Sequence, residues 1–205
     1  MASIIKVDDV QDAAGNNIIN ESGDTITIGA SGDTITVPSG ATFNVAGTVG
    51  TGFTPGITEA DMWRLNAFLY ASADPISANL ERVDNATFAK IGTGMSVSTG
   101  VWTFPSTGLW WVSTKCKGET LGSQLDLSIS ATANDGSAWD SVAMGGGYGT
   151  DNDAVYIGCD YFFNVTDTSN YKIKFVVAMA TNSNLAGYTT RTDSAFIFIR
   201  LGASQ

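Results

Sequence analysis

The sequence predicts a mainly β protein whose C-terminal part is an antiparallel sandwich. Apolar and polar side chains alternate along several segments; Leu125, Leu127 and Ile129, for example, are separated by polar residues. A period of two is that of a half-buried strand. The 205 residues include 23 glycines and only 15% charged side chains. This composition is typical of many tight turns and of a surface rich in Ser, Thr and Asn.

Charge and residue content exclude several function classes. The formal charge is −10 and the sequence pI is near 4.1, so nucleic acid is not expected as a partner, because phosphate backbones require a cationic surface. Histidine is absent, which removes Ser-His-Asp and Cys-His catalysis and imidazole zinc sites. We therefore expect no enzyme and no cofactor. Glycan cleavage by a pair of carboxylates stays open, since two carboxylates that are far apart in the sequence can lie together in the fold. Nothing in the sequence singles out two such residues.

The two cysteines are too few for a disulfide framework. Cys116 and Cys159 fall among predicted core positions and are expected to be small buried hydrophobic side chains rather than redox or metal groups. No apolar run is long enough for a membrane span, and the N-terminus is too polar for a signal peptide. We expect synthesis in a reducing cytosol and no membrane insertion.

Residues 1–21 predict a short hairpin. Two apolar stretches flank a turn at 13–16; the second is 17–20, and the first contains Ile4, Ile5, Val7 and Val10. So short a hairpin is marginal by itself. We expect these four residues to anchor the chain on an external scaffold.

Residues 22–53 contain an internal repeat. Ser22-Gly-Asp-Thr-Ile-Thr-Ile recurs from Ser31, and a looser copy begins at Ser39. Each unit is predicted to be a glycine turn and a short strand with two apolar positions: Ile26 and Ile28, Ile35 and Val37, Phe43 and Val45. Two such side chains cannot build a core, so partner chains are expected to cover this β-repeat stalk. The alternative is a Thr-rich meander packed on the main domain.

Residues 54–74 are predicted to be one short helix, at 54–71, and a linker. Thr58 can cap the helix, and an apolar stripe follows at helical spacing, with Met62, Leu65 and Leu69. A helix this apolar must be covered on more than one side. Packing of three copies around an axis and docking on the β domain are both consistent with the pattern.

Residues 75–203 predict the β domain. Roughly eight or more strands are expected, which fits a two-sheet sandwich, at 78–84, 88–92, 95–104, 109–117, 125–130, 138–144, 155–165, 171–179 and 195–201. The last strand is apolar on both faces, so we expect another subunit to cover one of them. The expected subunit interface comprises Phe196, Phe198, Leu201, Met62, Leu65 and Leu69.

The stretch 145–153 is the most unusual in the β domain. Its glycines match neither the P-loop nor the dinucleotide pattern, and we expect a mobile exposed loop that joins two strands. Its acidic end offers oxygen ligands for Ca²⁺ but lacks the full spaced set, so no metal is expected. Most tryptophans are expected in the core. The candidate recognition residues are Tyr148, Asp151, Asn152, Asp153, Trp139 and Tyr188.

Two segments of the β domain resemble a known superfamily. Gly100-Val-Trp-Thr-Phe-Pro-Ser-Thr-Gly-Leu-Trp-Trp-Val112 and the closing Ser194-Ala-Phe-Ile-Phe-Ile-Arg-Leu201 resemble the tumour-necrosis-factor (TNF)/complement globular-head superfamily. The resemblance covers roughly residues 75–203. It implies a ten-stranded jelly roll that assembles as a tight trimer, with the terminal strands near the threefold axis.

The first residues are similar to another group of proteins. Met-Ala-Ser-Ile-Ile-Lys-Val-Asp-Asp-Val10, followed by the Gly-Asp-Thr-Ile-Thr repeat, is similar to the amino-terminal segments of fibre and decoration proteins of marine tailed bacteriophages. This implies attachment to other virion proteins through residues 1–21. Both resemblances together imply a short homotrimeric fibre on the virion surface, made in the host cytoplasm, whose head contacts a host surface glycan or protein.

Two other functions remain open: a capsid cement or decoration protein that reinforces the particle, and a tail-associated enzyme that cleaves glycans. Residues 22–50, fully extended at about 3.3 Å per residue, reach only ~95 Å. This length excludes a long side fibre and leaves open whether the protein sits on the capsid or the tail.

Overall fold

The computed structural model describes residues 9–11, 13–15, 17–22, 25–29, 31–42, 56–120, 123–150 and 153–205. The chain divides into two compact units, Met1–Phe53 and Thr54–Gln205, which are described separately and called the N-terminal unit and the head. The described residues of both form strands and connecting segments, with no helix. In this part of the chain no helix is therefore long and apolar enough to cross a membrane.

The N-terminal unit contains a three-stranded antiparallel sheet in the order β1-β2-β3, with β1 (Asp9–Gln11), β2 (Asn17–Ser22) and β3 (Thr25–Ile28). The predicted hairpin is present, with Val10 paired to Ile19 and Gly15 in the turn at a φ of +88°. Ile4, Ile5 and Val7 lie outside the described residues. Val10, the fourth predicted anchor residue, is 39% exposed.

The repeat forms a strand only in its first copy. Ile26 and Ile28 lie in β3 and are 67% and 54% exposed. The second copy is described over 31–42 without a strand, and its Ile35 and Val37 are also exposed. The strand predicted there is absent: β3 of the first copy pairs with β2, whereas residues 31–42 pair with no described strand. The apolar positions of the third copy, Phe43 and Val45, lie outside the described residues.

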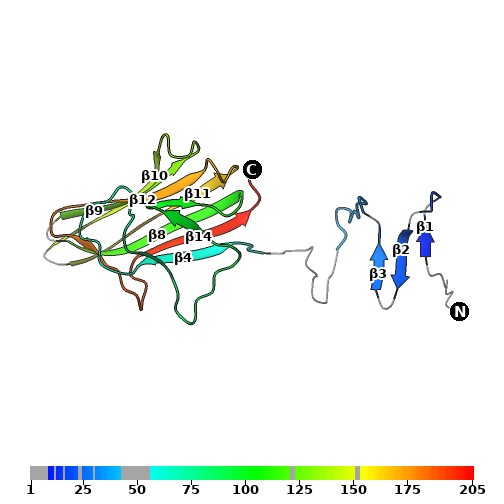
Figure 1. The fold of residues 1–205 in the computed structure, drawn as a ribbon, viewed down its shortest axis with the longest axis horizontal. Coiled ribbons are helices and arrows are strands. Elements are labelled where there is room, and N and C mark those ends of the chain that lie inside the picture. Colours follow the sequence, from blue (N-terminus) through cyan, green and yellow to red (C-terminus); the bar gives the residue numbers. More distant parts are fainter. Residues whose placement is uncertain are drawn as a thin grey trace. The chain divides into compact units, whose positions relative to one another are not determined.

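The head is an antiparallel sandwich, as predicted (Figure 1). A five-stranded sheet has the order β10-β9-β12-β7-β6, and a six-stranded sheet has the order β11-β8-β14-β4-β5, with β13 paired to β8. The strands are β4 (Ala60–Leu65), β5 (Leu80–Arg82), β6 (Ser96–Ser98), β7 (Val101–Thr103), β8 (Gly108–Thr120), β9 (Ser123–Thr132), β10 (Asp140–Gly149), β11 (Asp153–Val165), β12 (Lys172–Met179), β13 (Asn184–Leu185) and β14 (Ala195–Gly202).

Two predicted strands of the head differ from the structure. The segment predicted at 95–104 is a hairpin of β6 and β7, because Thr99 and Gly100 form a turn with φ values of +48° and +82°. The segment predicted at 88–92 is irregular and contributes only the bridge between Ile91 and Ala60.

The predicted helix at 54–71 is wrong. Its centre is strand β4, which pairs with β14 and β5. Leu65 faces the core, whereas Met62 pairs with Ile197 on the outer side of the sheet. The helical spacing of apolar residues was misleading because tertiary pairing outweighs local propensity. Thr58 caps no helix; its hydroxyl accepts a hydrogen bond from Arg200.

Two buried charges hold β4 in place. The Asp61 carboxylate accepts hydrogen bonds from the Arg82 guanidinium, the Trp63 indole N–H and the Met95 backbone N–H. Arg64 is fully buried and donates to Glu81, Asp84 and Asn85. Each charge is thus paired and hydrogen-bonded, the condition under which burial of a charge is tolerated.

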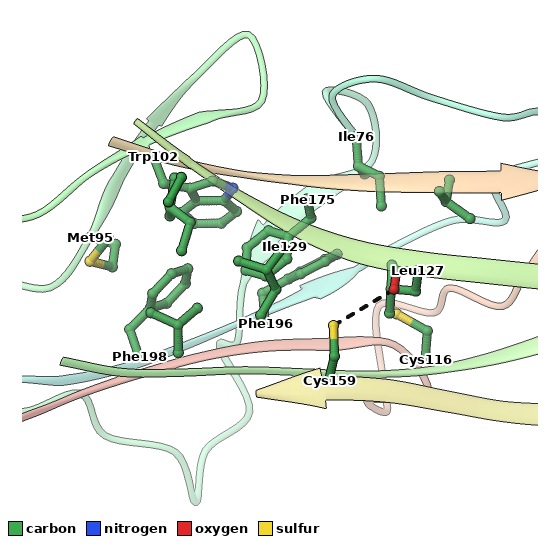
Figure 2. Close-up of a cluster of buried hydrophobic side chains, with 14 of the residues drawn as sticks. Ile76, Met95, Trp102, Cys116, Leu127, Ile129, Cys159, Phe175, Phe196 and Phe198 are labelled. Carbon is green, nitrogen blue, oxygen red and sulfur yellow. Dashed lines mark hydrogen bonds between the residues drawn. The ribbon is translucent and has the colours of Figure 1, made fainter. Parts of the chain in front are cut away.

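Aromatic side chains fill the core between the sheets (Figure 2). The rings of Phe175 and Phe196 have centroids 4.7 Å apart, and those of Trp102 and Phe198 are 5.0 Å apart. Phe196, Phe198 and Leu65 are fully buried in one chain. This corrects the prediction that they form a subunit interface: they belong to the core and offer no surface to a second chain.

The glycine run at 145–149 belongs to strand β10 and is not the mobile loop that we predicted. A Cβ added at Gly145 would lie 2.1 Å from the carbonyl oxygen of Gly158 in β11, and one at Gly147 would lie 2.3 Å from Val155. These glycines therefore allow the two sheets to approach closely at this edge of the sandwich.

Candidate functional site

The outer side of the six-stranded sheet carries large apolar side chains. Phe162 of β11 pairs with Trp111 of β8, which pairs with Ile199 of β14; these three point away from the core because their neighbours Trp110 and Phe198 point into it. Phe162 is 63% exposed. We define the apolar face by the outward residues Met62, Trp111, Tyr156, Phe162, Ile197 and Ile199.

The outer side of the five-stranded sheet is more polar. Its central strands β9 and β12 present Gln124, Asp126, Ser128, Lys172 and Lys174. The large exposed apolar side chains there, such as Met144, are on the edge strand β10. The central strand β12 adds the partly buried Val176 and the small Ala178. The two sides of the sandwich thus differ. Among the described residues of one chain, the six-stranded sheet leaves the row of large apolar side chains Phe162, Trp111 and Ile199 partly exposed, and Phe162 is the most exposed of the three.

A hollow of about 330 Å³ adjoins the apolar face. It lies beside Gly158, which has no side chain, and between Tyr156, Lys115, Asp160 and Asp193. Tyr156 is 77% exposed. The hollow combines an aromatic ring with charges of both signs. It therefore suits a ligand or side chain that has both a polar and an apolar part.

The head has two distinct ends. Ala60 pairs with Ile199 at the start of β4, so the chain enters the head at the same end as the C-terminus, which we call the proximal end (Figure 1). Residues 66–74 follow the last residue of β4, and residues 180–193 follow the last residue of β12. Both segments lie at the other end of the head, which we call the distal end.

The predicted recognition residues do not form one surface. Tyr148, near the end of β10, and Tyr188, whose N–H donates to the Leu65 carbonyl, both belong to the distal end. Trp139 lies in the proximal turn before β10, with the Lys174 ammonium 4.9 Å from its ring centroid. Asp151 and Asn152 lie outside the described residues, and Asp153 begins β11.

Only three of the six predicted interface residues, Met62, Leu69 and Leu201, keep some accessible surface in one chain. Met62 lies on the apolar face, and Leu201, next to the bulge near the end of β14, is 50% exposed. Leu69 is partly buried against the core. Sequence reasoning missed Phe162 and Tyr156, although both fall at outward positions of a strand whose alternate residues were assigned to the core.

A groove of about 560 Å³ lies at the distal end. It is formed by residues 70–72 and 179–184, which lie far apart in the sequence. Sequence reasoning missed it because residues 70–72 were assigned to the helix and linker. The only signal was the polar run Thr181-Asn-Ser-Asn184 after an apolar strand.

Both cysteines are free and buried in the core, as predicted. Burial raises the pKa of the Cys116 thiol to about 11, and burial with the nearby Asp160 charge does the same for Cys159. The Cys159 thiol lies 3.7 Å from the Leu127 carbonyl oxygen (Figure 2). Both groups are thus neutral thiols at neutral pH and are not activated nucleophiles.

We predict that alkaline pH destabilises the head through these thiols. Their pKa is raised from 9.0 to about 11 in the folded state, so between these values the unfolded chain loses protons that the folded chain retains. The free energy of unfolding then falls as pH rises, by up to about 2 to 3 kcal/mol for the fully buried Cys116 thiol and by less for Cys159. Thermal melts from about pH 8 to pH 11 measure the fall. Cys116→Ala should show a smaller one, whereas parallel curves for both proteins would contradict the prediction.

The described residues contain no group of three or more Cys, Asp or Glu side chains placed to hold a metal ion. Asp151 and Asn152, two of the three possible calcium ligands, lie outside the described residues. That no calcium binds there stays a prediction.

The head has the TNF-like jelly-roll fold. It is similar to Eiger TNF from S. frugiperda, with a TM-score of 0.55 and 13% identity over 73% of this chain and 96% of that chain. It is also similar to murine APRIL, with a TM-score of 0.52 and 9% identity over 70% of this chain and 98% of that chain. No protein-family model matches the sequence, and neither does any curated protein.

Proposed function

We propose that this protein is a non-enzymatic structural protein of a tailed-phage virion, a short homotrimeric fibre whose head assembles through the apolar face. The observation that supports the assembly in this proposal is the row of Phe162, Trp111 and Ile199 on a sandwich of TNF-like fold. Soluble monomers rarely leave such a row uncovered, and burial of apolar area is the main driving force of association.

A second copy is the expected occupant of the apolar face. The neighbouring hollow carries both Lys115 and Asp160, so identical chains related by an axis can offer each other opposite charges. The exposed Ile26 and Ile28 of the N-terminal unit add apolar area that copies of the same chain can cover. Sedimentation of the full-length protein at micromolar concentration tests this: a mass of three chains is expected, and a monomer would overturn the trimer.

The path of the chain supports a display role. The chain enters the head at the proximal end, and the groove and Tyr188 lie at the opposite end. If residues 1–21 attach to other virion proteins, this arrangement leaves the distal end for contacts with a host surface. Three copies of a weak contact raise the overall affinity without any new interaction.

Deletion of residues 1–21 should abolish incorporation into particles while leaving a folded trimeric head. The described core residues all lie at Leu65 or beyond, so the segment contributes nothing to the core of the head. Circular dichroism and sedimentation check the head, and protein analysis of purified particles checks incorporation.

Normal incorporation of the truncated protein would place the anchor elsewhere in the chain. If the intact protein raises the melting temperature of the capsid without affecting adsorption, the protein is a capsid cement. Loss of polysaccharide mass on incubation would instead indicate a glycan-cleaving enzyme.

A further inference from the structure

The distal groove has a rigid frame. Leu69 and Leu185 exchange two backbone hydrogen bonds of 3.0 and 2.8 Å, and Ala73 and Val177 exchange two of 2.9 and 3.0 Å. The Ser72 hydroxyl donates to the Met179 carbonyl and accepts from the Met179 N–H. The two walls, 70–72 and 179–184, are thus fixed to each other, and a preformed site binds without an ordering cost.

An aromatic ring stands at the rim of the groove. Tyr70 is 72% exposed and lines the groove. Its ring stacks on Phe68, with centroids 5.8 Å apart and an interplanar angle of 16°. Phe68 in turn meets Tyr188 edge to face at 5.3 Å, and the Arg191 guanidinium lies 3.8 Å from the centroid of the Tyr188 ring. This series of contacts supports the exposed ring from behind.

The rest of the groove is uncharged and presents polar groups beside the apolar Ala71, Met179 and Ala180. Its lining contains no acidic or basic side chain. Hydroxyl and amide groups are contributed by Ser72, Thr181, Asn182 and Asn184. Asn184 Oδ1 is buried with no hydrogen-bond partner among the described residues. An unsatisfied buried acceptor is uncommon in folded proteins and can accept a hydrogen bond from a ligand.

We propose that the distal groove binds a neutral carbohydrate. The C–H face of a pyranose ring packs on an exposed aromatic ring such as Tyr70, while the sugar hydroxyls require the mixed donors and acceptors that Thr181 and Asn182 supply. The volume of about 560 Å³ falls in the range of small-molecule sites. A neutral carbohydrate would be the host ligand in the proposed display role. Only the biological purpose of the groove rests on that role.

The charges favour a neutral ligand over an anionic one. The groove lacks a basic residue, and the formal charge of −10 repels sialylated, sulfated or uronic-acid glycans.

The test applies full-length protein to an array of neutral oligosaccharides of glucose, galactose, mannose and N-acetylglucosamine, with sialylated and sulfated glycans alongside. Calorimetric titration then measures the affinity for the best neutral glycan. Binding to neutral glycans is expected. Tyr70→Ala should weaken it about fivefold, since stacking on one ring is worth roughly 1 kcal/mol, and Tyr70→Trp should preserve it. Thr181→Ala should weaken it as well.

Tyr148→Ala is the matched control, because Tyr148 is 68% exposed and belongs to the distal end but does not line the groove. It should bind as the unmodified protein does. The proposal fails if no neutral glycan binds at millimolar concentration, if anionic glycans or a peptide bind there instead, or if Tyr70→Ala has no effect. Sedimentation of the same samples keeps the two proposals separate: a trimer without binding refutes the groove alone, and a monomer that binds refutes the trimer alone.

Discussion

Phe198→Asp is expected to unfold the head. The Phe198 side chain has no exposed surface, and its ring lies 5.0 Å from Trp102 and 5.9 Å from Phe175. Removal of a buried aromatic ring costs about 3 to 5 kcal/mol, and a carboxylate in the same place adds a large desolvation penalty. The sum approaches the total stability of an ordinary domain, about 5 to 15 kcal/mol.

Near-ultraviolet circular dichroism and the yield of soluble protein measure this effect. Phe198→Leu is the control, because it keeps an apolar side chain in the core and should lower the melting temperature much less. A folded Phe198→Asp protein with an unchanged melting temperature would mean that the ring is not in the core.

Phe162→Asp is expected to leave the fold intact and to dissociate the trimer. Phe162 belongs to the same sheet as Phe198 but faces outward and is 63% exposed. Surface substitutions usually change stability by no more than about 0.5 kcal/mol. In an assembled trimer the new carboxylate would be buried without a partner, which costs several kcal/mol at each interface. The sedimentation mass should fall from three chains to one.

Met144→Asp is the matched control for Phe162→Asp. Met144 is 67% exposed on β10, in the other sheet, so the same charge is added without touching the apolar face. This variant should remain a trimer. A trimeric Phe162→Asp protein, or a monomeric Met144→Asp protein, would rule out the apolar face as the assembly surface.

The β strands of the head were largely predictable because period-two alternation is local. Leu125, Leu127 and Ile129 alternate with polar residues over one strand, and the structure buries all three. The same alternation holds in β11, where Val155 and Ile157 face the core. In both strands the apolar pattern alone was sufficient to assign the inner face.

The error at 54–71 has a physical cause. Met62, Leu65 and Leu69 share a helical spacing, but strand β4 is determined by its pairing with β5 and with β14, which lies near the other end of the chain. Asp61 and Arg64 would have been costly on a buried helix without those partners. Their ion pairs with Arg82 and Glu81 arise only when the strands are adjacent.

The sites were less predictable than the strands. The recognition residues were chosen for loop composition, yet Gly145 and Gly147 lie in a strand where close approach of the sheets requires them. The distal groove joins Tyr70 and Ser72 to residues more than a hundred positions later. No local pattern reports such a juxtaposition.

The fold class, the absence of histidine chemistry and the inward faces of the long strands follow from the sequence, because composition and alternation act locally. Which aromatic residues are core and which are surface follows from the tertiary structure. Phe196 and Phe198 are buried in one chain, whereas Phe162 is exposed, although all three belong to apolar strands. Whether a side chain is buried depends on whether the second sheet packs against its side of the strand. Pairing between strands that are far apart in the sequence determines which side that is.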